Sequence, residues 1–187
     1  YKKMLFSDLF FSFLGAIITL ILPLIIRYIT TNVIYKETST AINIISILII
    51  FMVGLIILEV YCNFFITYYG HIMGAKMEFD MRNEIFQHYQ KLSFNFFNNQ
   101  KTGQLMSRIT NDLFDISELF HHGPEDIMIS IIKLIGSFTI LFLINSNLAL
   151  IAFSVTPFII FYAGYLNRRM KKAFVLNRRR IADVNAQ

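Results

Sequence analysis

Two long runs of this chain carry almost no charge, and they exclude an ordinary water-soluble fold. From Ala41 to Ala75 the only charged residue is Glu59, and from Ile127 to Asn167 the only charged residue is Lys133. A helix that crosses a bilayer needs about 20 apolar residues. The first run therefore predicts a helix that continues well beyond the lipid, and the second run is long enough for two spans.

With a further apolar run near the N-terminus, the pattern predicts an all-α membrane protein with four long transmembrane helices that extend into the cytoplasm. The expected spans cover about residues 9–28, 41–66, 125–144 and 148–167. The segment from Tyr1 to Phe10 has one apolar face, which favours a helix that lies in the membrane interface before the chain turns into the first span. Pro157 is expected to bend the fourth span.

Residues 71–122, between the second and third spans, are expected to form a cytoplasmic hairpin of two long helices. Its returning helix carries apolar residues at spacings of four, four, three and four, namely Leu105, Ile109, Leu113, Ile116 and Phe120. At about 93–99 the pattern breaks. Ser93 can cap a new short helix, and turn-forming residues follow at Asn98, Asn99, Thr102 and Gly103. This tip is either a docking element or an ordinary solvated connection.

The distribution of Lys and Arg predicts the orientation. If the N-terminus lies inside the cell, the inner segments hold fourteen of these residues and the outer turns hold at most two. We therefore expect a multi-pass protein of the cell membrane, with the N-terminus and residues 71–126 in the cytoplasm. The basic cytoplasmic extension, 168–187, is expected to face lipid headgroups, since no nucleic-acid recognition motif accompanies it.

Charged groups inside the spans are costly, so Glu59 and Lys133 are candidates to line a wet cavity or to face each other. Their different depths argue against a direct bond. Gly70 and Gly74 permit a close helix approach. His121 and His122 are neighbours on different helix faces with no Cys nearby, so no metal site is expected.

The stretch MRNEIFQHYQKLSFNFFNNQKTGQLMSRITND resembles the membrane domain of ABC exporters, in which six long helices precede a nucleotide-binding domain. The residues that match the family's pattern are Arg82, Phe86, Leu92, Phe96, Phe97, Gly103, Leu105, Ser107, Arg108 and Asp112. The stretch NSNLALIAFSVTPF is similar to the family's short outer turn and proline-bearing fourth helix. The resemblance covers essentially the whole chain.

The resemblance implies that the short helix is a coupling helix, which docks on the nucleotide-binding domain through Ser93, Phe94, Asn95, Phe96, Phe97, Asn98 and Asn99. It also implies that five residues fasten neighbouring helices together: Arg82, Gly103, Ser107, Arg108 and Asp112. For Arg108 and Asp112, a solvated pair on one helix is an equally good reading. The expected partners are membrane lipid, a nucleotide-binding domain in the same full-length chain, and a second half-transporter, identical or related.

The fifth and sixth spans, the second coupling helix and the ATPase domain do not occur in this sequence, which we expect to be part of a longer chain. No Gly is followed by Lys, so the phosphate-binding loop of an ATPase is excluded within these residues. ATP and Mg²⁺ are expected for the nucleotide-binding domain, and no catalytic, cofactor or metal residue is expected here. The alternative is a four-span sensor whose helical stalk signals to a partner without transport. Multidrug or lipid export would be typical of similar proteins, and the sequence does not specify the substrate.

Overall fold

The computed structural model describes residues 1–98 and 100–184. Among the described residues, four helical stretches are long and apolar enough to cross a membrane: Lys2–Val33, Thr38–Tyr89, Thr102–Ile144 and Ser146–Asn177. The expectation of an all-α membrane protein is therefore confirmed. The chain divides into two compact units, residues 1–135 and residues 136–187.

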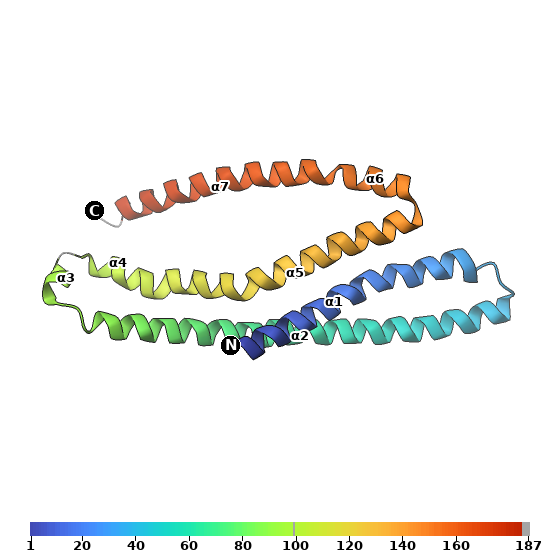
Figure 1. Cartoon of the computed structure of the whole chain (residues 1–187), viewed down its shortest axis with the longest axis horizontal. Helices are drawn as coiled ribbons and strands as arrows, with labels where there is room; N and C mark the ends of the chain where they lie inside the picture. The colour runs from blue at the N-terminus through green and yellow to red at the C-terminus, as the bar shows by residue number, and fades with distance from the viewer. Residues whose placement is uncertain (99, 185–187) are drawn as a thin grey trace. The chain divides into compact units, whose positions relative to one another are not determined.

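In the first unit, helix α1 (Lys2–Tyr28) runs antiparallel to helix α2 (Thr38–Tyr89), and a π-helical turn, η1 (Ile29–Val33), ends the first of them (Figure 1). Small residues let the two helices approach, since a Cβ at Gly15 would lie 3.7 Å from Cβ of Cys62. Next to this contact, the rings of Phe11 and Phe65 lie 4.0 Å apart between centroids. Around these residues the pair is therefore held by apolar packing.

Helix α1 differs from the sequence-based expectation at its start. We expected a separate interfacial helix up to Phe10, but α1 is unbroken from Lys2 to Tyr28. No Gly or Pro occurs before Gly15, so nothing in the sequence interrupts the helix. The Tyr1 hydroxyl donates a hydrogen bond to the Asp80 carboxylate on α2. The first turns of α1 therefore pack along α2 rather than turn away from it.

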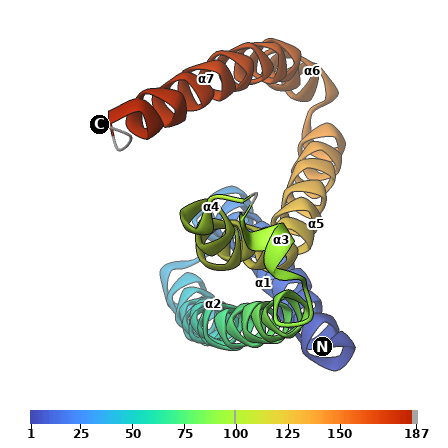
Figure 2. The same ribbon diagram turned by 90° about the vertical axis from the view of Figure 1, so that its left-hand side faces the viewer.

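The hairpin continues from α2 through the short helix α3 (Phe94–Asn98) into α4 (Thr102–Ser107) and then α5 (Leu113–Ile144), which are labelled in Figures 1 and 2. A π-helical turn, η2 (Arg108–Asp112), joins α4 to α5. On the returning helical side of the hairpin, the buried positions recur every four residues: Leu105, Ile109, Leu113, Ser117, His121 and Glu125. The expected repeat is correct up to Leu113. Beyond it, Ile116 and Phe120 are exposed, and polar residues take the buried face instead.

In the second unit, α5 ends at Ile144 and is followed by α6 (Ser146–Ser154) and α7 (Thr156–Val184). The side chain of Asn145 caps α6 by accepting a hydrogen bond from the backbone N–H of Leu148 at 3.0 Å. The rings of Phe138 and Phe153 pack edge to face at 4.9 Å. The helix is interrupted at Val155, so that Pro157 falls in the first turn of α7, where its missing N–H is tolerated.

Candidate functional site

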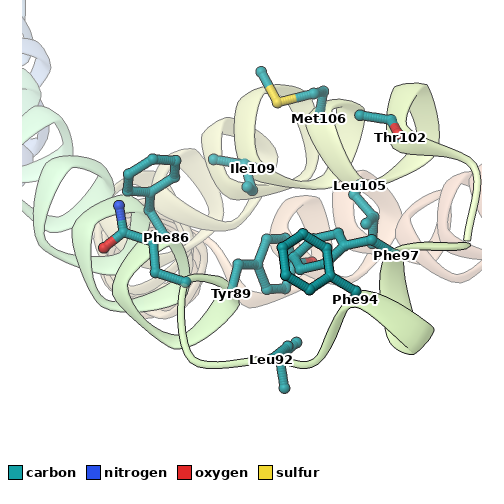
Figure 3. Close-up of a pocket in the computed structure, with 10 residues that line it drawn as sticks. Phe86, Tyr89, Leu92, Phe94, Phe97, Thr102, Leu105, Met106 and Ile109 are labelled. Atoms are coloured by element: carbon teal, nitrogen blue, oxygen red, sulfur yellow. The ribbon is translucent and has the colours of Figure 1, made fainter.

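The tip of the hairpin encloses an apolar groove of about 370 Å³ between α2, α3 and α4 (Figure 3). The side chains that line it come from both long helices and from α3: Phe86, Tyr89, Gln90, Leu92, Phe94, Phe97, Thr102, Leu105, Met106 and Ile109. Phe94 and Phe97 of α3 and Leu105 of α4 all contribute to this lining (Figure 3). The short helix is thus anchored on the two long helices by its own aromatic side chains.

The three phenylalanines of α3 have different surroundings. Phe94 is 89% exposed, whereas Phe96 and Phe97 are half-buried. The rings of Phe96 and Phe97 meet edge to face at 5.4 Å, and the ring of Phe96 lies 6.3 Å from that of Tyr89. Phe96 and Phe97 are therefore the more buried rings of α3, while Phe94 lines the groove but remains mostly exposed.

The polar residues of the tip lie around α3. Ser93 precedes the helix, and its backbone carbonyl accepts a hydrogen bond from the N–H of Phe96 at 3.0 Å. Asn95 and Asn98 are exposed, and Asn99 lies outside the described residues. The exposed surface of the tip thus combines one aromatic ring with polar side chains.

Of the residues expected to fasten helices, Arg82 joins the two sides of the hairpin. Its Nε donates a hydrogen bond to the backbone carbonyl of Ile109 at 3.3 Å, and its guanidinium pairs with Glu78 on its own helix. The other expected residues make no such connection across the described part of the hairpin. Ser107 accepts a local hydrogen bond from Asn111 at 3.4 Å, a Cβ at Gly103 would meet open space, and Arg108 and Asp112 are exposed.

The two charged residues inside the predicted spans lie on different helices, α2 and α5. Glu59 on α2 is half-buried, and its carboxylate accepts a hydrogen bond from the hydroxyl of Thr19 on α1 at 2.9 Å. Lys133 is exposed on α5. Glu59 therefore belongs to the contact between α1 and α2.

A buried polar cluster lies where α1, α2 and α5 meet in the first unit. It contains Asp8 of α1 with His121 and Glu125 of α5, whose candidate ligand atoms all lie within 4.8 Å of one another. On α2, Gly70 makes room for the imidazole, because a Cβ at this position would overlap the His121 ring. Burial, together with the nearby His122 and His71, lowers the pKa of His121 and favours its neutral form.

This cluster was not predicted from the sequence. Asp8 was assigned to the polar face of an interfacial helix, and His121 was compared only with its neighbour His122. Asp8 and Glu125 are more than 100 residues apart in the chain. The available signal was the spacing of four from Leu113 through Ser117 and His121 to Glu125, which continues the buried face with polar side chains.

Comparisons with known proteins agree with this architecture. The family model of the ABC transporter transmembrane region matches residues 5–187. The chain is 38% identical over 190 residues to "Uncharacterized ABC transporter ATP-binding protein YwjA" of Bacillus subtilis, an alignment that covers 100% of the chain and 32% of that relative.

Two further relatives carry export in their names. The chain is 25% identical over 175 residues to "Putative multidrug export ATP-binding/permease protein YgaD" of Bacillus subtilis, covering 92% of the chain and 30% of the relative. It is 26% identical over 176 residues to "Putative multidrug export ATP-binding/permease protein SAOUHSC_02003" of Staphylococcus aureus, covering 92% and 30%. The chain spans about a third of the length of these relatives. With its four long apolar helices and a family match over nearly its whole length, the chain belongs to the ABC transporter transmembrane region family.

Proposed function

We propose that this chain is the membrane-spanning part of an ATP-driven exporter, which forms part of the substrate pathway and receives the movement of nucleotide-binding domains through α3. The complete protein would bind ATP and Mg²⁺ in its nucleotide-binding domain and work with a second half-transporter, identical or related. In the proposed orientation, α3 lies in the cytoplasm, where such a domain would meet it.

The observation that carries the proposal is the hairpin. Helix α2 has 52 residues, about 78 Å at 1.5 Å per residue, whereas the hydrocarbon core of a bilayer is about 30 Å thick. The helix therefore extends far beyond the lipid and ends at α3. A short helix held on the ends of two long ones can pass a push on to both of them.

Within α3, the exposed ring of Phe94 is the best candidate to contact the nucleotide-binding domain. Aromatic side chains that enter a pocket of the partner contribute much of the binding energy of an interface. Phe94 and Phe97 both line the groove and Phe96 packs near Tyr89, but Phe94 is much more exposed than the other two rings. Phe94 is therefore assigned to docking, and Phe96 and Phe97 to positioning the helix that carries it.

The names of two relatives suggest a class of substrate for the complete transporter. Two of them are named as multidrug exporters. We propose an amphipathic or apolar substrate, which the complete transporter would take from the membrane or the cytoplasm.

The test uses the full-length transporter in proteoliposomes, with ATP hydrolysis and substrate transport measured on the same preparation. Phe94→Ala is expected to lower transport at least about tenfold, the effect of losing an interface anchor worth about 2 kcal/mol, while hydrolysis continues. The thermal stability of the protein should change little, because Phe94 is 89% exposed.

Phe79→Ala is the matched control, since Phe79 is 67% exposed on α2 but lies well before the tip. It removes the same ring without touching α3. If Phe94→Ala transports as many substrate molecules per ATP as Phe79→Ala and the unaltered protein, the docking assignment fails.

A further inference from the structure

The buried cluster at the junction of α1, α2 and α5 is not used by the proposed coupling mechanism. Asp8 is 1% exposed, His121 is 0% exposed and Glu125 is 8% exposed. These three residues come from two helices and offer two carboxylates and one imidazole to a common point. Ser12 lies one turn after Asp8 on α1 and is also buried.

The polar atoms of this cluster are not satisfied by the rest of the described chain. Both carboxylate oxygens of Asp8, both ring nitrogens of His121, Oε2 of Glu125 and Oγ of Ser12 are buried without a hydrogen-bond partner among the described residues. Removing such groups from water without a partner destabilises the fold, and more strongly when the groups are charged. A group that binds all of them at once would remove this destabilisation.

The chemistry of the donors selects a divalent cation. Carboxyl groups bind a metal in their ionised form, and two ionised carboxylates with a neutral imidazole would carry two negative charges, which a divalent ion would balance. Imidazole nitrogen together with carboxylate oxygen is a donor set suited to Zn²⁺ and related transition metals, which bind both at about 2.0–2.2 Å. The atoms lie within 4.8 Å of one another, so small side-chain rotations would bring them to one ion.

The neighbouring histidines form a second, more exposed group. The ligand atoms of His71, His121 and His122 also lie within 4.8 Å of one another. However, His122 lies 3.4 Å from the Glu118 carboxylate and 3.8 Å from Oε2 of Glu125, and His71 lies 4.0 Å from the Glu118 carboxylate. These two side chains already have an acidic partner, whereas Asp8 and His121 have none among the described residues.

We propose that Asp8, His121 and Glu125 bind a divalent transition-metal ion, with the Ser12 hydroxyl beside them. The ion would connect the first turns of α1 to α5 at the point where Gly70 admits the His121 ring. The N-terminal helix would then be fixed to the returning side of the hairpin by metal coordination as well as by packing. This inference does not depend on what the transporter exports or on how α3 docks.

The test uses the full-length protein, purified without a histidine tag and free of nucleotide. After treatment with EDTA, it is titrated with Zn²⁺, and bound metal per chain and the melting temperature are measured. One Zn²⁺ ion per chain and a raised melting temperature are expected, and Co²⁺ in its place should give visible absorption typical of nitrogen and oxygen ligands.

Asp8→Asn and Glu125→Gln keep the side-chain volume and remove a carboxylate. Each should weaken Zn²⁺ binding by at least the 10–100-fold effect, roughly, that follows from loss of a residue that only orients a ligand. Glu118→Gln is the matched control, because it removes a carboxylate two turns earlier on α5 and should leave the affinity within about threefold.

Three results would overturn the proposal. The first is no effect of Zn²⁺ on the melting temperature and no bound metal in the unaltered protein, a measurement that does not need any variant to fold. The second is Zn²⁺ binding that survives Asp8→Asn and Glu125→Gln but is lost in His71→Gln, which would place the ion at the exposed histidines. The third is an increased stability of both carboxylate variants with unchanged metal binding, which would identify a carboxyl pair that shares a proton.

Discussion

At the scale of single residues, Gly70 is the glycine that tolerates a side chain least. A Cβ at this glycine would overlap the imidazole of His121, which itself is fully buried between helices. The ring also packs against His71, at 5.3 Å between ring centroids. The imidazole therefore cannot move away without disturbing its neighbours.

Gly70→Ala is expected to destabilise the protein by about 1–3 kcal/mol, the usual effect of inserting a methyl group into a packed site. This loss opposes the gain of about 1 kcal/mol that alanine brings to a helix interior. The measurement is the midpoint of chemical unfolding of the purified full-length protein.

Gly74→Ala provides the comparison. A Cβ at Gly74 would lie 3.9 Å from Cβ of His121, which is ordinary contact. This variant should be neutral or slightly stabilised. Equal stability of the two alanine variants would show that His121 does not occupy the space next to Gly70.

The neighbours of Gly70 and Gly74 were easier to predict than those of Asp8. The G-x3-G spacing at Gly70 and Gly74 predicted a close helix approach, and His121 and Ser117 are the residues that approach them. The partner of Asp8 was not predictable in the same way. The three-dimensional neighbours of Asp8 follow from the unbroken course of α1 along α2, and the assumed interfacial helix placed this carboxylate in the wrong environment.

At the scale of helices, the apolar repeat predicted the hairpin and the break in its pattern predicted a short helix at the tip. The structure has α3 at Phe94–Asn98, inside the expected range. The π-helical turn η2 was not predicted, because nothing in RITND distinguishes it from an ordinary helical turn. This turn lies between α4 and α5, in the segment where buried residues recur every four positions. The expected repeat did not include the buried positions after Leu113.

The hydrogen bond from Arg82 to the Ile109 carbonyl connects the two long sides of the hairpin. Arg82→Met keeps much of the aliphatic side chain but removes this donor and the pair with Glu78. We expect a loss of about 0.5–1.5 kcal/mol, the usual net value of one hydrogen bond, confined to the hairpin.

Hydrogen exchange of the backbone amides in residues 94–112 measures this effect, since a loosened hairpin opens more often. Arg108→Met is the control, because Arg108 is exposed on η2. An identical increase of exchange in both variants would mean that Arg82 has no special part in joining the helices.

At the scale of the whole molecule, the orientation proposed from Lys and Arg can be tested directly. The prediction is that Lys36 lies outside the cell and Lys101 inside. With Cys62 replaced by Ala, Lys36→Cys should react with a membrane-impermeant maleimide on intact cells. Lys101→Cys should react only after the membrane is made permeable.

Both lysines are exposed, so accessibility within the protein does not favour either site. The opposite labelling pattern would reverse the orientation and would remove α3 from the compartment that contains ATP.

The number of spans was predictable from the uncharged runs alone, because the lipid requirement of about 20 apolar residues is strict. Contacts between side chains that are far apart in the sequence, such as Asp8 and Glu125, were not predictable in this way.

The unbroken course of α2 has one further consequence. Glu59 is held by Thr19 of α1, about 45 Å of helix before the end at Tyr89, at 1.5 Å per residue. If α2 pivots at this contact, a tilt of about 5° moves the inner end of the helix by about 4 Å, and the outer end moves in the opposite direction. Such a tilt would separate the helices on one side of the membrane and bring them together on the other.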